Sequence, residues 1–260
     1  MNEIQLKTPS EIELMRRSGR IVAEVLDGLE DLVRPGAQLA ELDQFAEATI
    51  RGHGAVPSFK GYPNSQQPDR PFPGSICASV NDVIVHGIPT DYVLQEGDIL
   101  GVDCGAILGG WHGDSARTYR VGECGSEALD LLRTTAEALE KGIAALEVGK
   151  PLGRVGNAIQ THAESNGYAV VREFVGHGVG RNLHEFPKVA NFGPADSGPV
   201  VEIGLTIAIE PMINVGTIHT KIDPDGWTIR TADGSLSAHY EHTVAVTAAG
   251  PEILTVASHG

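Results

Sequence analysis

The sequence predicts an α+β fold. Three observations support this prediction: apolar residues recur at helical spacing in four stretches, the strand candidates are joined by glycine-rich turns, and the order helix, break, helix, strand occurs twice. Glycine-rich turns favour antiparallel pairing, and helices grouped with antiparallel strands are typical of α+β proteins. With 260 residues, 41% of them hydrophobic, the chain is long enough to bury one large core.

The helices are expected at the start of each half of the chain. Thr8-Pro9-Ser10-Glu11 carries the signals of a helix N-terminus, and Arg34-Pro35-Gly36 ends the apolar pattern that follows. The four helical patterns run from Thr8 to about Leu29 and over 39–50, 126–146 and 155–163. Because the second pair repeats the plan of the first, we predict one domain over 1–260 with two structurally related halves, about 1–125 and 126–260.

The strand candidates lie between and after the helices. They are rich in β-branched and apolar residues and are bounded by turn residues. They cover 76–80, 98–107, 113–121, 170–175, 205–210 and 240–246. The one proline-rich polar stretch, 63–74, is expected to be an exposed loop.

Composition excludes several classes of function. A formal net charge of −15 disfavours nucleic acid as a partner, because phosphate binding needs clustered lysine and arginine. The three cysteines form neither a CxxC pair nor an even disulfide framework, and free thiols fit a reducing compartment. No apolar stretch approaches the roughly 18 residues of a membrane span. We therefore expect a soluble cytoplasmic protein without a membrane partner.

Two aspartates are the most informative feature of the chain. If Leu108-Gly109 is the two-residue turn of a hairpin, Asp103 and Asp114 stand directly opposite each other, with Cβ atoms roughly 5 Å apart. Like charges at that distance repel, so the arrangement favours a cation between them. The alternative for either aspartate alone is a solvent-facing or turn-capping residue.

Three further side chains occupy unusual settings. His177 stands between glycines in GHGVG, where the backbone can approach a ligand closely. Glu210 ends the apolar run LTIAIE, and Glu241 precedes another β-rich run, so both carboxylates are expected to be buried. A structural histidine and a Glu210 paired with an arginine are the alternatives. Four carboxylates and one imidazole together suit Mn, Fe, Co or Zn rather than a thiolate site.

Seven motifs in order connect these residues to a known family. They are NDVIVHGIP (81–89), GVDCG (101–105), HGDSA (112–116), GHGVG (176–180), LHEFP (183–187), IEPM (209–212) and YEHTVAVT (240–247). Together they closely resemble type I methionine aminopeptidases over nearly the whole chain, from about Ser10 to Val256. The resemblance implies the pita-bread fold, in which two pseudo-symmetric halves carry a curved antiparallel sheet covered by helices.

The resemblance also implies two divalent metal ions, drawn from Co, Mn, Fe and Zn. Asp114 and Glu241 would bridge them, Asp103 would complete the shell of one, and His177 with Glu210 would complete the shell of the other. A metal-bridging water or hydroxide would then attack the first peptide bond of the substrate.

Catalytic roles follow from the same resemblance. Glu210 would shuttle protons, His184 would donate a hydrogen bond to the developing oxyanion, and His86 would contact the amide nitrogen of the scissile bond. For both histidines the alternative is a structural side chain packed in the core.

The implied activity is removal of N-terminal methionine when the second residue is small. The implied partners are N-termini of nascent polypeptides, with the ribosome as a candidate place of encounter, and the family is usually monomeric. The methionine pocket would be lined by aromatic, sulfur-containing and aliphatic side chains, whose alternative is ordinary core: Phe59, Tyr62, Phe72, Cys77, Leu183 and Trp227. The stretch between Tyr62 and Phe72 is longer than is usual in the family, and it flanks this pocket.

Two other functions share the implied fold. The first is that of a prolidase or aminopeptidase P, which normally carries a large N-terminal domain. The second is that of a non-catalytic binding protein, but such proteins have lost metal ligands, whereas all five candidate ligands are present here.

Overall fold

The computed structural model describes residues 3–257. Within this range the helices are α1 (Pro9–Glu30), α2 (Leu39–Gly52), α3 (Ser126–Ala144) and α4 (Gly153–Ser165). The strands are β1 (Val56–Pro57), β2 (Ile76–Val80), β3 (Val83–Val85), β4 (Ile99–Leu108), β5 (Trp111–Arg120), β6 (Ala169–Val170), β7 (Gly176–Gly178), β8 (Glu185–Val189), β9 (Thr206–Ile209), β10 (Met212–Asn214), β11 (Thr220–Ile222), β12 (Ile229–Thr231), β13 (Ser237–His239), β14 (His242–Thr247) and β15 (Gly250–Ile253). All strand pairing is antiparallel, which confirms the predicted α+β class.

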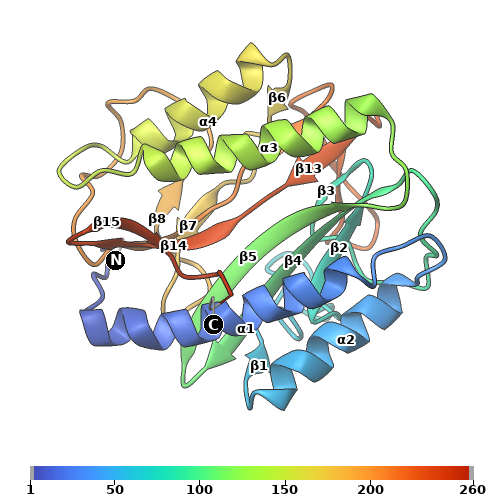
Figure 1. The fold of residues 1–260 in the computed structure, drawn as a ribbon, viewed down its shortest axis with the longest axis horizontal. Coiled ribbons are helices and arrows are strands. Elements are labelled where there is room, and N and C mark those ends of the chain that lie inside the picture. The colour runs from blue at the N-terminus through green and yellow to red at the C-terminus, as the bar shows by residue number, and fades with distance from the viewer. Residues whose placement is uncertain (1–2, 258–260) are drawn as a thin grey trace.

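The helices lie on the outside of the strands. In Figure 1 the α1/α2 pair lies below the sheets and the α3/α4 pair lies above them. Helix α1 begins where the sequence predicts, because the Thr8 hydroxyl accepts a hydrogen bond from the Glu11 backbone N–H and the Glu11 carboxylate accepts one from the Thr8 backbone N–H, a complete capping box. Each helix buries one apolar face, consistent with the spacing that predicted it.

The sheets form two main groups. In the first half, β4 pairs with β5 along its whole length, with β2 at residues 100–104 and with β1 at residues 106–107. The core of this half is filled by α1 and α2 residues such as Leu26 and Leu42. The second half contains the sheet β15-β14-β9-β7-β8, against which α3 and α4 bury residues such as Leu131 and Ile159. The division into pseudo-symmetric halves at about residue 125 stays a prediction.

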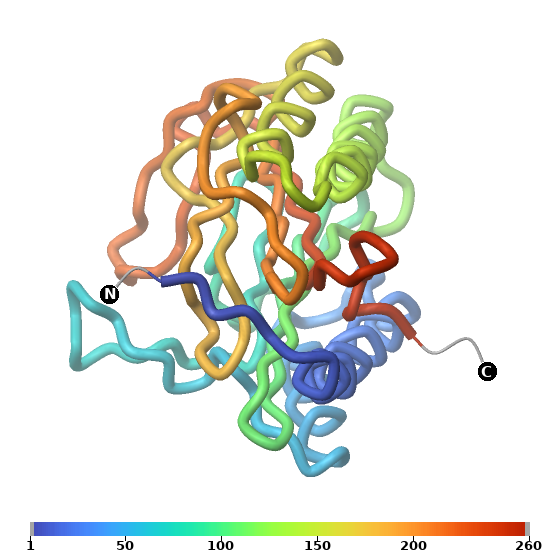
Figure 2. Tube along the Cα trace, turned by 90° about the vertical axis from the view of Figure 1, so that its left-hand side faces the viewer, coloured from blue at the N-terminus to red at the C-terminus, as the bar shows by residue number. Residues whose placement is uncertain are grey.

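Strand β5 joins the two groups. The Ala116 and Glu241 backbones exchange a pair of hydrogen bonds, of 3.3 and 2.9 Å, so the first half meets the second at Glu241. Residues of α1, β5 and the C-terminal segment also share a small apolar cluster that includes Met15, Trp111 and Leu254. As Figure 2 shows, the part of the C-terminal segment that follows β15 and is described by the structure lies beside α1.

Some expected elements differ in extent. The strand expected over 170–175 is only β6, since its exposed residues Arg172 and Glu173 lie outside any sheet. The strand expected over 240–246 begins at His242, because Tyr240 and Glu241 connect β13, which pairs with β10, to β14, which pairs with β9. Across 3–257, no helix combines the length and hydropathy that crossing a membrane requires.

The 63–74 segment is a loop, as predicted, but not exposed throughout. Most of its side chains face solvent, whereas Asn64 and Phe72 are buried. Its stem is closed by backbone hydrogen bonds from Gly61 to Phe72 and from Phe72 to Tyr62. The two ends of the loop are therefore held together by backbone hydrogen bonds.

Candidate metal centre and substrate pocket

The β4–β5 hairpin carries the aspartate pair in a register different from the one expected. Leu108 pairs with Trp111, so the turn is Gly109-Gly110, and Asp103 faces Ala116 rather than Asp114. Both turn glycines have positive φ, 60° and 80°, as a tight hairpin turn of the I′ type requires. The prediction that the aspartates stand directly opposite is therefore wrong. They are diagonal neighbours on one face of the ladder, a relation in which Cα atoms are about 7–8 Å apart.

Burial disfavours the ionised form of both aspartates. Burial raises the pKa of Asp103 to about 7 and that of Asp114 well above its ordinary range, the nearby Asp103 charge adding to the second effect. One oxygen of each, Oδ1, is buried without a hydrogen-bond partner. Such atoms cost free energy unless something outside the described chain satisfies them.

His177 is held by strand β7, which lies between β8 and β9. Its Nδ1 lies 2.9 Å from the Gly178 carbonyl oxygen, which can only accept, so Nδ1 carries the proton and Nε2 presents a lone pair. That Nε2 is 3.7 Å from Asp114 Oδ2 and 3.5 Å from Glu210 Oε1. Burial lowers the pKa of His177 to about 3, which keeps the ring neutral and able to bind a cation.

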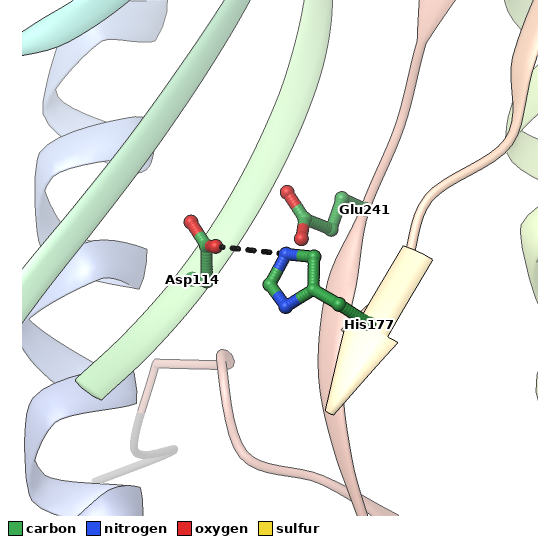
Figure 3. Close-up of side chains that lie close together, drawn as sticks. All are labelled: Asp114, His177 and Glu241. Carbon is green, nitrogen blue, oxygen red and sulfur yellow. Dashed lines mark ion pairs between the residues drawn. The ribbon is translucent and has the colours of Figure 1, made fainter. Parts of the chain in front are cut away.

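Glu210 and Glu241 each lie next to the end of a strand, Glu210 after β9 and Glu241 before β14. Glu210 directly follows β9, and burial, together with Asp103, raises its pKa to about 8. Glu241 is held against β5 through Ala116, and burial raises its pKa well above the ordinary range, with Asp114 adding to the shift. Its Oε1 is also buried without a partner. Figure 3 shows Asp114, His177 and Glu241 pointing toward one another.

These donors fit a divalent metal. One ligand atom each from Asp114, His177 and Glu241 lie within 4.8 Å of one another. Within residues 3–257, no lysine or arginine forms an ion pair with any of the four carboxylates, which excludes the expected alternative of Glu210 paired with arginine; the ion-pair contacts they make are with histidines. Buried carboxylate oxygens without a partner, beside a neutral imidazole, form a donor set for Mn, Fe, Co or Zn.

All thirteen predicted site residues border one cavity of about 160 Å³. Its lining includes the five candidate metal ligands, and also His86 and His184. The six predicted pocket residues line it too and form one apolar cluster: Phe59, Tyr62, Phe72, Cys77, Leu183 and Trp227. Ile88, which the sequence did not single out, packs against the same apolar cluster.

The two wall histidines are positioned differently. His86 has φ +59°, an uncommon conformation for a non-glycine residue, and its ring meets Phe174 and Trp227 edge-on at centroid distances of 5.7 and 6.4 Å. His184 Nδ1 lies 2.7 Å from the Tyr62 hydroxyl, and its ring centroid is 4.3 Å from that of His177. Burial lowers the pKa of both, to about 4 for His86, so neither ring carries charge near neutral pH.

Sequence reasoning missed His239. This residue is buried in β13, two positions before Glu241, and its Nε2 has no hydrogen-bond partner and lies 3.7 Å from Glu210 Oε2. The available signal was its place in the sequence AHYEHTVAV, two residues before the candidate ligand Glu241.

Comparison with known proteins agrees with this geometry. Residues 13–248 match the model of metallopeptidase family M24. Methionine aminopeptidase of Clostridium perfringens is 50% identical over 253 residues, which cover 97% of this chain and 99% of the relative. The crystal structure of methionine aminopeptidase from Rickettsia prowazekii superposes with a TM-score of 0.93 at 40% identity, covering 98% of this chain and 100% of that one.

The family match and the donor set define the class, a metal-dependent peptidase. A Xaa-Pro dipeptidase from Bacillus anthracis also superposes, with a TM-score of 0.75 over 98% of this chain and 63% of its own, but its 23% identity shows only the shared fold. The chain belongs to metallopeptidase family M24 and, within it, to the methionine aminopeptidases. The predicted pita-bread fold and family are thereby confirmed.

Proposed function

We propose that this protein removes the N-terminal methionine from nascent proteins and peptides, with a preference for a small second residue. One observation carries the proposal: the same cavity is lined by a cluster of metal donors and by an apolar cluster that forms an aromatic, sulfur-containing slot. An unbranched thioether suits that slot, because it is flexible, polarizable and makes favourable contacts with aromatic rings. Methionine bound there would place its carbonyl carbon at the donor cluster.

The donor cluster would hold two divalent ions from the series Co, Mn, Fe and Zn. Asp103, Asp114, His177, Glu210 and Glu241 would hold them. The number of carboxylates supports this, since four buried negative charges need more than one dication to be neutralised. The ligand types do not select among these metals, because selection depends on supply as well as affinity.

Metal ions bound to this cluster would supply the positive charge that acidifies a water and polarises the substrate carbonyl. Glu210 would take the proton from the attacking water and return it to the leaving amine. His184, neutral and beside His177, can donate a hydrogen bond to the oxygen on which negative charge develops. His86, which meets Trp227 edge-on and lines the same cavity, can contact the amide nitrogen of the scissile bond.

A peptide assay separates the two enzymatic functions that share this fold. Protein loaded with each candidate metal is incubated with Met-Ala-Ser and with Ala-Pro-Ala. We expect release of methionine from the first and no cleavage of the second. Cleavage before proline with methionine left in place would instead establish a prolidase or aminopeptidase P.

Metal content is measured on the same protein. Mass spectrometry of protein purified without added metal is expected to find about two divalent ions per chain at full activity. Full activity at a single ion per chain would contradict the dinuclear arrangement.

Two further proposals concern the partners of the protein. Size-exclusion chromatography with light scattering tests whether the protein is a monomer. Co-sedimentation with ribosomes tests whether it binds the ribosome, where it would encounter nascent chains.

A further inference from the structure

We infer that residues 63–71, called the strap below, set the width of the methionine pocket by holding the indole of Trp227. This inference rests on the proposed function of the pocket. The strap is the cyan excursion at the left edge of Figure 2, and it contacts the loop 223–228 that connects β11 to β12. The two segments are more than 150 positions apart in the sequence.

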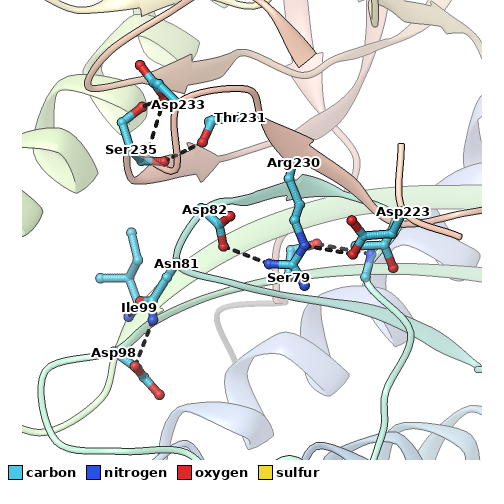
Figure 4. Close-up of polar contacts among 12 residues, drawn as sticks. Ser79, Asn81, Asp82, Asp98, Ile99, Asp223, Arg230, Thr231, Asp233 and Ser235 are labelled. Atoms are coloured by element: carbon cyan, nitrogen blue, oxygen red, sulfur yellow. Dashed lines mark hydrogen bonds and ion pairs between the residues drawn. The ribbon is translucent and has the colours of Figure 1, made fainter. Parts of the chain in front are cut away.

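The backbone of the Trp227 loop is rigid without help from the strap. Asp225 accepts hydrogen bonds from the Trp227 and Thr228 backbones and from the Thr228 hydroxyl. Arg230 pairs with Asp223 and Asp82, each at 2.7 Å, which ties the loop to the turn before β3 (Figure 4). These contacts fix the Cα of Trp227 but leave its long side chain free to rotate.

The strap fixes that side chain. Trp227 Nε1 donates a hydrogen bond of 2.9 Å to the Arg70 carbonyl oxygen, and the indole meets Phe72 edge-on at 5.2 Å. A tryptophan held at its N–H by one segment and at its ring edge by the same segment's stem can adopt few rotamers. The indole therefore forms a fixed wall of the cavity.

Asn64 docks the strap on the loop. It is only 6% exposed, and its Oδ1 accepts hydrogen bonds from the Gln66 and Gln67 backbones, which shapes the turn inside the strap. Its Nδ2 donates to the Gly226 carbonyl oxygen at 3.0 Å, next to Trp227. A Cβ on Gly226 would lie 2.6 Å from Gln67 Nε2, so the glycine allows this close approach. The two functions of Asn64 use different atoms and can be separated.

The stem connects the strap to the residues that line the cavity. Tyr62 and Phe72, at its two ends, both line the cavity, and Tyr62 also contacts His184. The prolines at 63, 68 and 71 limit the backbone freedom of the strap. A rigid strap excludes side chains that branch near the ring of Trp227 and accepts a slender thioether. Leucine is therefore the discriminating competitor.

The test uses Asn64→Asp, which keeps the oxygen that shapes the turn and removes the N–H donor to Gly226. Gly226→Ala disturbs the same contact from the loop side, because Gly226 has φ +80° and the added methyl group would also meet the Gln67 side chain. Ser65→Ala is the matched control, because the exposed Ser65 hydroxyl makes no hydrogen bond within residues 3–257. Each metal-loaded variant is assayed with Met-Ala-Ser and Leu-Ala-Ser, and metal content and circular dichroism are recorded alongside.

We expect the ratio of kcat/KM for methionine over leucine to fall about fivefold or more in Asn64→Asp and Gly226→Ala, mainly through KM, and to stay unchanged in Ser65→Ala. Acrylamide quenching of tryptophan fluorescence is expected to increase in the same two variants. The signal reports Trp227, since the other tryptophan, Trp111, is 3% exposed.

Full discrimination together with wild-type quenching in Asn64→Asp would overturn the role of the strap. Increased quenching with full discrimination would also overturn it, since the indole would then be free without effect on the pocket. A wild-type protein that releases no methionine would overturn the proposed function instead. The quenching readout does not depend on activity, so the two failures are distinguishable.

Discussion

Several single residues in the cavity are carboxylates whose negative charge no lysine or arginine of the described chain balances. Asp103, Asp114 and Glu241 each bury an oxygen without a partner, and no lysine or arginine within residues 3–257 pairs with them. Retaining such groups costs stability, so their presence is explained by what they bind rather than by what they contribute to the fold.

Binding and turnover should therefore respond differently to two substitutions. Asp114→Ala removes a central donor, and we expect loss of most bound metal and a fall in kcat/KM on the order of a thousandfold or more. His184→Ala is expected to lower kcat about a hundredfold while metal content stays near wild type, because the ring would act on the oxyanion. Metal analysis with the Met-Ala-Ser assay checks both. A His184→Ala variant with wild-type turnover would remove His184 from the mechanism.

His239 is expected to orient Glu210. Its buried Nε2 faces Glu210 Oε2 at 3.7 Å, so His239→Leu should lower metal affinity roughly tenfold or more, as loss of a ligand's polar neighbour generally does. His239→Gln keeps an amide at a similar reach and should restore most of that affinity. Isothermal titration of the metal-free variants measures both. Equal affinities in the leucine and glutamine variants would contradict the role.

At the level of elements, the glycines of β7 decide where His177 lies. A Cβ on Gly176 would stand 2.3 Å from the Ala208 carbonyl oxygen, and one on Gly178 would stand 2.6 Å from that of Phe186. Strand β7 therefore fits between β8 and β9 because its residues on both sides of His177 lack side chains.

Gly178→Ala should accordingly lower both stability and metal binding. The added methyl group meets backbone atoms that cannot rotate away, and we expect a loss of roughly 1–3 kcal/mol in the free energy of unfolding, with His177 displaced. Urea denaturation and metal titration measure the two effects. Gly52→Ala is the control, since a Cβ there has no neighbour within 4 Å at the end of α2. Wild-type stability in Gly178→Ala would contradict the packing argument.

In the whole molecule, the donor cluster joins the two groups of strands. Asp103 and Asp114 come from the first sheet, and His177, Glu210 and Glu241 come from segments beyond α4. A cation bound by both sides would cross-link the fold, so metal binding adds to its stability.

The metal-free protein should lose stability between pH 6.5 and 8. In the folded state the pKa values of Asp103 and Glu210 are raised to about 7 and about 8, from ordinary values of 3.8 and 4.5. Their stabilising contribution is present at low pH and lost as the pH rises through the folded-state values. Buried histidines such as His177 and His239 have lowered pKa values, so they weaken the fold only below pH 6.5, where the unfolded chain binds protons. Above pH 6.5 the carboxylates alone decide the trend.

Urea midpoints of chelated protein at pH 6.5 and 8 measure this loss. Added metal should raise the midpoint more at pH 8 than at pH 6.5, because protons then compete less for the carboxylates. Asp103→Asn should show a smaller loss between the two values. A midpoint of the chelated protein that rises with pH across this window would contradict the prediction.

Local patterns determined much of this protein. The capping box at Thr8 and Glu11, the apolar spacing of the four helices and the long strands β4 and β5 follow from residues close together in the chain. The five donors also stood out individually, as carboxylates or an imidazole in apolar or glycine-rich settings. Their joint assignment came from seven ordered motifs and their family resemblance rather than from geometry.

What only the tertiary structure decided involves contacts between distant segments. The hairpin register depended on which two residues form the turn, and Gly109-Gly110 rather than Leu108-Gly109 fits the required positive φ values. The place of Glu241 depended on its backbone pairing with Ala116, and the docking of the strap on the Trp227 loop depended on Asn64. Such contacts are set by which surfaces meet once the core has formed. Local sequence can supply the groups, but only the packed chain selects their partners.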